Sequence, residues 1–145
     1  MTLSLASAAP TTPAQLLQQA QTIAVVGYSS NPSKPANFAP AELARRGWTI
    51  VPVNPNAGII DGMTSYATLA DIPFKVDLVD VFRPASEAAD IARQAAAIGV
   101  KTLWLQKGIV STEARDIAAK AGMAFVQDQC AGATAAHLDL TPAKG

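Results

Sequence analysis

Cysteine and histidine are almost absent from this sequence of 145 residues, which holds only Cys130 and His137. One cysteine cannot form a disulfide within the chain, and one cysteine with one histidine is too few for a structural zinc site. We therefore predict no metal site and a reducing compartment, the cytoplasm. Long apolar runs are missing as well. None approaches the roughly 20 residues that a membrane-spanning helix needs, so we expect a soluble protein with no membrane partner.

An excess of either charge is also absent, since 11 basic residues stand against 11 acidic ones. Without a net field, the whole molecule has no general attraction to nucleic acid or to an anionic membrane. We expect no nucleic-acid partner. Any site for an anion must be built from a few local groups.

The N-terminal residues lack the positively charged start and the long apolar stretch of a signal peptide. We predict a flexible N-terminal arm over residues 1–11, one domain over 12–138 and a flexible C-terminal tail over 139–145. Half of the residues are hydrophobic, which is enough to fill one core without disulfides or metal.

The chain does contain a regular alternation of short apolar runs and helical segments. The predicted strands are Ile23–Val26, Thr49–Val53, Leu78–Phe82, Thr102–Leu105 and Ala124–Val126. Their apolar residues do not alternate with polar ones, which is typical of strands covered on both faces. The predicted helices are a leading one that begins at Thr12 and Pro13, then Asn37–Arg46, Glu87–Ile98 and Thr112–Ala121, the last three each followed by glycine.

Strands and helices in this order predict an α/β fold. We expect a three-layer Rossmann-like doubly wound sheet of about five parallel strands with helices on both faces. The link from Asn54 to Val76 is less regular, with a short helical turn at Ser65–Ala70. Ligands of such sheets bind beyond the carboxyl ends of the strands, where the strand order reverses.

Small polar residues follow the first predicted strand. Gly27 allows a tight turn, Ser29 and Ser30 offer hydroxyl groups, and the next helix presents free N–H groups. This pattern is equally consistent with a phosphate cradle and with a plain capped turn. It is not the dinucleotide fingerprint, because serine and proline stand where G-x-G-x-x-G needs its second and third glycines.

The second strand is followed by Asn54. Pro52 stands two residues before it, Val53 directly before it and Pro55 directly after it. A typical NAD site has an acidic residue near this point to bind the ribose hydroxyls. Its absence disfavours an unmodified NAD site. The stiff Asn-Pro segment provides either a wall for a flat base or a simple turn.

The third and fourth strands end in residues with ligand-binding chemistry. Arg83 suits a phosphate, and Phe82 suits a ring or a flexible arm of a ligand. Gln106 offers a hydrogen bond to a ligand amide, and Gly108 allows close approach to the backbone. Core packing and a glycine turn explain the fourth strand end equally well.

A catalytic centre is not evident. Asp77 and Asp80 lie three apart on a strand, so their side chains point to opposite faces, and we expect Asp80 to be a structural partner for backbone or a neighbouring base. No base adjoins Cys130, which favours a small buried thiol, and His137 lies in a segment expected to be mobile. We predict a ligand-binding module with no catalytic residues rather than an enzyme.

With these segments in order, the chain resembles the small stand-alone CoA-binding-domain proteins, whose fold is similar to the nucleotide-binding domain of the succinyl-CoA synthetase alpha subunit. The resemblance rests on IAVVGYSSNPSKP, GWTIVPVNPN, YATLADIPFKVDLVDVFRP, AIGVKTLWLQKGIV and FVQDQC, which span most of residues 23–130. It implies coenzyme A as the ligand, free or as an acyl-CoA. It further implies that the ADP part lies over Gly27, Tyr28, Ser29, Ser30, Lys34 and Asn37, that Val53, Asn54 and Pro55 flank adenosine, and that Phe82, Arg83 and Pro84 face the phosphates or pantetheine.

The chain departs from the family pattern at a few positions. Family members commonly have a basic or aromatic residue in place of Asn37, a helix former in place of Pro40 and arginine in place of Gln129. The phosphohistidine chemistry of the synthetase needs a second domain, so that activity does not carry over. Four hypotheses stay open: a CoA carrier or sensor, an enzyme with Cys130 as acyl acceptor, a module that pairs with itself or with an acyl-CoA enzyme, and an NAD or adenine-nucleotide binder.

Overall fold

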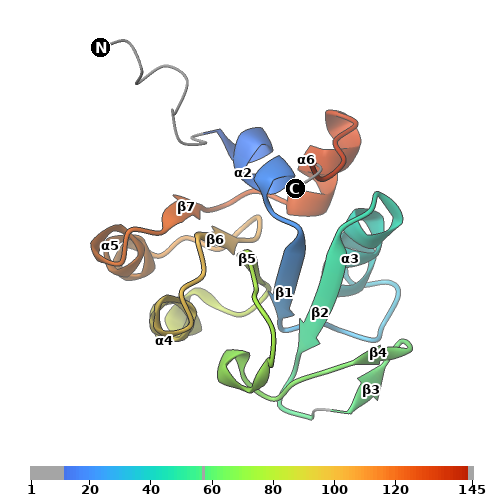
Figure 1. Ribbon diagram of the computed structural model, residues 1–145, viewed down its shortest axis with the longest axis horizontal. Coiled ribbons are helices and arrows are strands. Elements are labelled where there is room, and N and C mark those ends of the chain that lie inside the picture. The colour runs from blue at the N-terminus through green and yellow to red at the C-terminus, as the bar shows by residue number, and fades with distance from the viewer. Residues whose placement is uncertain (1–11, 57, 144–145) are drawn as a thin grey trace.

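A five-stranded parallel sheet forms the centre of the protein in the computed structural model, which describes residues 12–56 and 58–143 (Figure 1). Its strands, in spatial order, are β2 (Thr49–Val53), β1 (Thr22–Val26), β5 (Leu78–Val81), β6 (Thr102–Leu105) and β7 (Ala124–Val126). All neighbouring strands pair in parallel. This confirms the predicted α/β class and all five strands, which agree with the prediction to within one residue at each end.

Helices cover both faces of the sheet. The helices α2 (Pro13–Gln19), α3 (Pro35–Arg45) and α6 (Ala131–His137) pack on one face, and α4 (Ala85–Ala97) and α5 (Thr112–Lys120) pack on the other (Figure 1). Successive strand residues alternate between the two cores. Ile23 and Val25 belong to the α2–α3–α6 side, and Ala24 belongs to the α4–α5 side.

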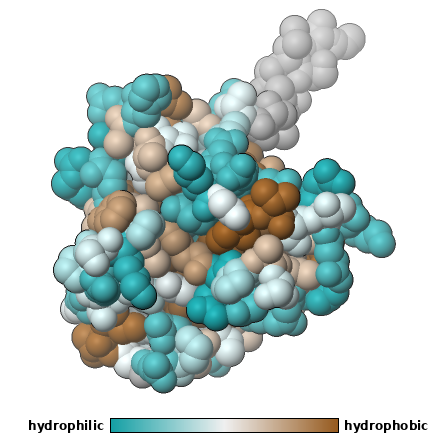
Figure 2. Space-filling model, turned by 180° about the vertical axis from the view of Figure 1, so that it is seen from behind, coloured by the Kyte–Doolittle hydropathy of each residue, from teal (hydrophilic) through white to brown (hydrophobic). Residues whose placement is uncertain are grey.

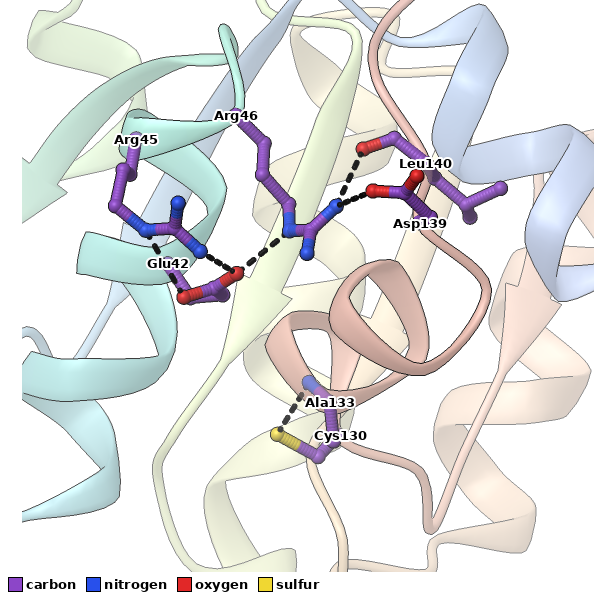
Figure 3. A network of polar contacts seen from close by, with 7 residues as sticks. All are labelled: Glu42, Arg45, Arg46, Cys130, Ala133, Asp139 and Leu140. Atoms are coloured by element: carbon purple, nitrogen blue, oxygen red, sulfur yellow. Dashed lines mark hydrogen bonds and ion pairs between the residues drawn. The ribbon is translucent and has the colours of Figure 1, made fainter.

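The helix α6 lies where the sequence indicated only a mobile segment. Its Gly132 sits against α3 so closely that an added Cβ would lie 2.7 Å from the carbonyl oxygen of Ala39. Beyond the helix, Leu140 is buried, and Arg46 donates hydrogen bonds to the Asp139 carboxylate and the Leu140 carbonyl (Figure 3). The flexibility of 139–145 stays a prediction, and the arm over 1–11 lies outside the described residues.

The irregular link between β2 and β5 contains a hairpin. The strands β3 (Ile59–Ile60) and β4 (Met63–Thr64) pair in antiparallel, and the turn residues Asp61 and Gly62 both have positive φ, at 49° and 78°. Asp-Gly between apolar residues is a strong hairpin signal that the sequence reading did not use. The 3-10 helix η1 (Leu69–Asp71) follows, at the end of the helical turn predicted for Ser65–Ala70.

Hydrophilic side chains cover most of one face of the molecule, interrupted by small hydrophobic patches (Figure 2). The large apolar side chains that stay exposed in the described residues are Phe38, Ile59, Phe74, Ile98, Val110 and Leu138. No helix within residues 12–56 and 58–143 is both long enough and apolar enough to cross a membrane.

Candidate functional site

The strand order reverses between β1 and β5, because the chain leaves β1 for a helix on one face and leaves β5 for a helix on the other. Gly27 directly follows β1 with φ of 91°. A Cβ at this position would lie 2.9 Å from both the Phe82 carbonyl oxygen and the Arg83 Cδ. Only glycine therefore allows the two strand ends to approach this closely, at the place where doubly wound sheets bind ligands.

A pocket of about 840 Å³ opens at this point, and we call it the switch-point pocket. Its volume lies in the range of small-molecule sites. It is lined by the ends of β1 and β2, the β3–β4 hairpin and the first turns of α4: Val26, Gly27, Tyr28, Ser29, Ser30, Val53, Asn54, Pro55, Asn56, Ile59, Ile60, Asp61, Ala67, Thr68, Arg83, Ser86, Glu87, Asp90, Ile91 and Gln94.

The predicted site residues divide among three places. Those that line the switch-point pocket are Gly27, Tyr28, Ser29, Ser30, Val53, Asn54, Pro55 and Arg83. Lys34, Phe82 and Gln106 line a second pocket instead. Asn37, Pro84 and Gly108 line neither pocket. Asn37 holds other residues in place, and the Gly108 N–H donates to the Asp128 carboxylate at 2.7 Å.

Internal hydrogen bonds shape the loop after β1. The Ser29 hydroxyl accepts from the Asn31 N–H at 3.1 Å, and the Ser29 N–H donates to the carbonyl of Ala36 in α3 at 3.3 Å. That carbonyl is available because Pro40, four residues on, has no N–H to donate to it. Pro40, which stands in place of the family's usual helix former, thus fits a loop anchored on α3.

Two side chains tie this loop to the hairpin. The phenol of Tyr28 donates to the Asp61 carboxylate at 2.6 Å, and the Asn37 amide donates to the same oxygen at 2.9 Å and to the Ser29 carbonyl at 2.8 Å. Burial and the adjacent Asp61 carboxylate raise the pKa of Tyr28, so the phenol remains a donor at neutral pH. The amide of Asn54 adds a bond of 3.1 Å to the Tyr28 carbonyl.

Three carboxylates and one guanidinium line the switch-point pocket: Asp61, Glu87, Asp90 and Arg83. Arg83 forms a two-point ion pair with Glu87, one turn along α4, at 2.7 and 3.0 Å. The hydrogen bonds from Arg83 lower the pKa of the Glu87 carboxyl, so Glu87 is charged at neutral pH. The sequence reading missed all three carboxylates. Two sequence features could have indicated them: the Asp-Gly hairpin signal at Asp61, and the position of Glu87 in the first turn of α4, directly after β5.

The second pocket, of about 480 Å³, lies between α3 and the ends of β5 and β6. It is lined by Lys34, Pro35, Ala36, Phe38, Phe82, Gln106, Lys107, Ile109 and Cys130, and we call it the thiol pocket. Cys130 caps α6, where its Sγ accepts the Ala133 N–H at 3.4 Å (Figure 3). Its side chain is partly exposed, so the expectation of a buried thiol was wrong.

The two aspartates near β5 do not form an acidic pair. Asp77 lies before the strand, where its carboxylate accepts the N–H groups of Gln21 and Thr22 at 3.0 and 2.9 Å. Asp80 lies inside the sheet, and in the described residues neither of its carboxylate oxygens has a hydrogen-bond partner. The expectation that Asp80 binds backbone or a base was therefore wrong. Burial raises its pKa to about 7.

Comparison with known proteins shows which family the chain matches. The family model described as the CoA binding domain matches residues 21–136. The uncharacterized protein YneT of Bacillus subtilis is 28% identical over 116 residues, which cover 80% of this chain and 86% of its own. The structure of cell-free ID.343 from Thermus thermophilus is 36% identical with a TM-score of 0.80, covering 85% of this chain and 93% of that one.

A larger protein also contains this fold. The dinucleotide-forming acetyl-coenzyme A synthetase 1 of Ca. Korarchaeum cryptofilum matches 75% of this chain at 27% identity and a TM-score of 0.66, although the match covers only 26% of the synthetase chain. The family match spans every strand of the central sheet and the pocket at its switch point. The chain therefore belongs to the family of CoA-binding domains.

Proposed function

We propose that this protein binds coenzyme A or an acyl-CoA, with the adenine nucleotide part of the ligand in the switch-point pocket. The observation that carries the proposal is a roomy pocket at the β1–β5 switch point of a chain that belongs to the CoA-binding domains. In this arrangement, Val53 and Pro55 border the adenosine, and the loop of Ser29 and Ser30 faces the phosphates through its backbone.

Arg83 is the charged group that we assign to the phosphates. It is the single cation among the described residues that line the pocket, and its side chain is 46% exposed, so a ligand can reach it. Planar guanidinium groups bind phosphate through two parallel hydrogen bonds. A bound phosphate must compete with Glu87 for that group, which predicts modest rather than tight affinity.

The carboxylates that line the switch-point pocket make NAD a second candidate ligand. The sequence argument against NAD rested on the lack of an acidic residue after β2, yet Asp61 and Asp90 reach the same pocket from the hairpin and from α4. Carboxylates bind free ribose hydroxyls and repel a ribose phosphate. We therefore propose CoA as the first ligand and keep NAD and ADP as competitors.

Thermal unfolding with CoA, NAD and ADP separates these ligands. A ligand at 100 times its Kd stabilises the fold by about 2.7 kcal/mol. We expect CoA to raise Tm and Arg83→Gln to weaken binding about tenfold. Arg93→Gln is the matched control, because Arg93 pairs with Glu113 at 3.1 Å outside both pockets. A shift with NAD and none with CoA overturns the proposal.

The biological role in this proposal is that of a carrier, a sensor or a partner module in the cytoplasm. The likeness to about a quarter of the Ca. Korarchaeum cryptofilum synthetase favours the partner module, because there the matching region is one part of a larger chain. Native mass spectrometry of the purified protein tests for a homodimer, and the same experiment with candidate acyl-CoA enzymes tests for a complex.

A further inference from the structure

The thiol pocket lies outside the space assigned to the nucleotide. Apart from its two lysines, Gln106 and Cys130, its walls are apolar: Pro35, Ala36, Phe38, Phe82 and Ile109. Such a lining suits a hydrocarbon group and gives a diphosphate nothing to bind except Lys34 and Lys107 at exposed positions. The pocket therefore fits a mostly apolar ligand that carries a few polar atoms.

Gln106, which lines the thiol pocket, has a buried oxygen atom without a hydrogen-bond donor in the described residues. The residue is only 6% exposed, and its Oε1 atom has no hydrogen-bond partner in the described residues. A buried amide oxygen without a donor is unfavourable, and a ligand N–H removes the penalty. The pantetheine arm of coenzyme A contains two amide N–H groups, so the Gln106 oxygen matches its chemistry.

Cys130 places a nucleophilic atom in the same wall. Its side chain is partly exposed, and its Sγ lies at the start of α6, where it accepts the Ala133 N–H (Figure 3). A thiol that reaches an apolar pocket is positioned to meet the carbonyl carbon of an acyl thioester.

The two pockets are close along the chain. Phe82 lines the thiol pocket and the next residue, Arg83, lines the switch-point pocket. In the loop after β1, Ser30 lines the switch-point pocket and Lys34 lines the thiol pocket. A ligand with a nucleotide head and a long flexible arm can thus contact both.

We infer that the thiol pocket takes the pantetheine and acyl-thioester end of an acyl-CoA, and that Cys130 accepts the acyl group. This inference rests on the proposed function for the nucleotide part of the ligand. The Cys130 thiol loses its proton to solvent, and its sulfur attacks the thioester carbonyl carbon. A new carbon–sulfur bond forms to Cys130, the bond to the CoA sulfur breaks, and CoA leaves as a thiolate that takes up a proton. No oxidant or second substrate is needed.

Intact-mass measurement after incubation with octanoyl-CoA tests the transfer. We expect the mass to rise by one octanoyl group, hydroxylamine to remove it, and Cys130→Ser to abolish it. The nucleotide-free thioester S-octanoyl-N-acetylcysteamine serves as the comparison. Acylation by octanoyl-CoA is expected to be faster by about tenfold or more at equal concentration, because the held nucleotide makes the attack intramolecular.

Gln106→Leu separates a positioning role from simple exposure of the thiol. We expect this variant to lose about tenfold in the rate of acylation by octanoyl-CoA, since the amide contact is lost, while iodoacetamide still alkylates Cys130 at the wild-type rate. Octanoyl-CoA that raises Tm but leaves Cys130 unmodified overturns the acyl transfer and leaves the proposed function intact. Slow acylation by both thioesters without any Tm shift from CoA overturns the proposed function and removes the basis of the inference with it.

Discussion

The phenol of Tyr28 donates a hydrogen bond of 2.6 Å to the carboxylate of Asp61, 33 residues further along the chain. This bond joins the loop after β1 to the turn of the β3–β4 hairpin, and both residues line the switch-point pocket. Asn37 supports the same carboxylate oxygen from α3. These polar contacts hold the hairpin over the pocket, together with Ile60 and Met63, which pack against the core.

Tyr28→Phe tests that dependence, because it removes the donor and keeps the ring. We expect a loss of about 1.5 to 3 kcal/mol in the free energy of unfolding, the usual value of a hydrogen bond to a charged acceptor, measured by urea denaturation. Amide exchange should also quicken over residues 59–64. Tyr66→Phe is the control, since the Tyr66 hydroxyl has no hydrogen bond in the described residues and its ring packs edge-on against Phe74. Equal stability of the two variants would contradict the prediction.

Glu87→Gln tests the competition for Arg83. The carboxylate of Glu87 occupies the guanidinium and adds negative charge to the pocket. Its removal should tighten CoA binding about fivefold at low salt, since a unit charge about 4 Å away in water is worth roughly 1 kcal/mol. Calorimetry measures the change, which should shrink at high salt. Glu113→Gln breaks the comparable pair with Arg93 and should leave affinity unchanged.

Asp80 makes stability depend on pH. Burial raises its pKa from 3.8 to about 7, so the folded state holds this proton more tightly than the unfolded state does. The contribution of the protonated carboxyl is complete below about pH 4 and is lost as the pH rises to the folded-state pKa of about 7. The loss amounts to a few kcal/mol at most. We expect urea denaturation to show wild-type stability falling between about pH 4 and about pH 7.

Asp80→Asn should lack this part of the pH dependence, because an amide does not titrate. The other groups titrate in both proteins, so the difference between the two pH profiles isolates Asp80. Carbon NMR of the Asp80 carboxyl gives an independent check, with a midpoint near 7. Parallel stability profiles and an Asp80 midpoint near 4 would show that the carboxyl is hydrated in solution.

Gly132→Ala tests the contact between α6 and α3. Alanine is favoured over glycine within a helix by about 1 kcal/mol, so a local effect would stabilise the protein. The new Cβ, however, would lie 2.7 Å from the Ala39 carbonyl oxygen. Relieving this contact requires a shift of the α3 or α6 backbone, which costs free energy. We expect a net loss of about 1 to 3 kcal/mol in thermal or urea denaturation. Ala136→Gly, at an exposed position of the same helix, should cost no more than about 1 kcal/mol.

Much of the fold was predictable because its signals are local. Short apolar runs such as Ile23–Val26 and the glycines after the helices depend on neighbouring residues and on backbone sterics alone. The strand ends also indicated where a ligand site would form, and most of the predicted residues there line one of the two pockets. Helix α6 escaped prediction, because its seven residues are stabilised by tertiary packing through Gly132 rather than by a strong apolar pattern.

The sequence by itself determined the parallel α/β sheet, the edge of that sheet at which the switch-point pocket opens and the family to which the chain belongs. Tertiary structure alone decided which side chains share a pocket: it brought Asp61 to Tyr28, separated Phe82 from Arg83 into different pockets and left the Asp80 carboxyl buried without a partner. The physical reason is the separation along the chain over which each kind of interaction acts. Helix caps and strand patterns act over a few residues, whereas burial and charge in a pocket depend on segments that only the folded chain brings together.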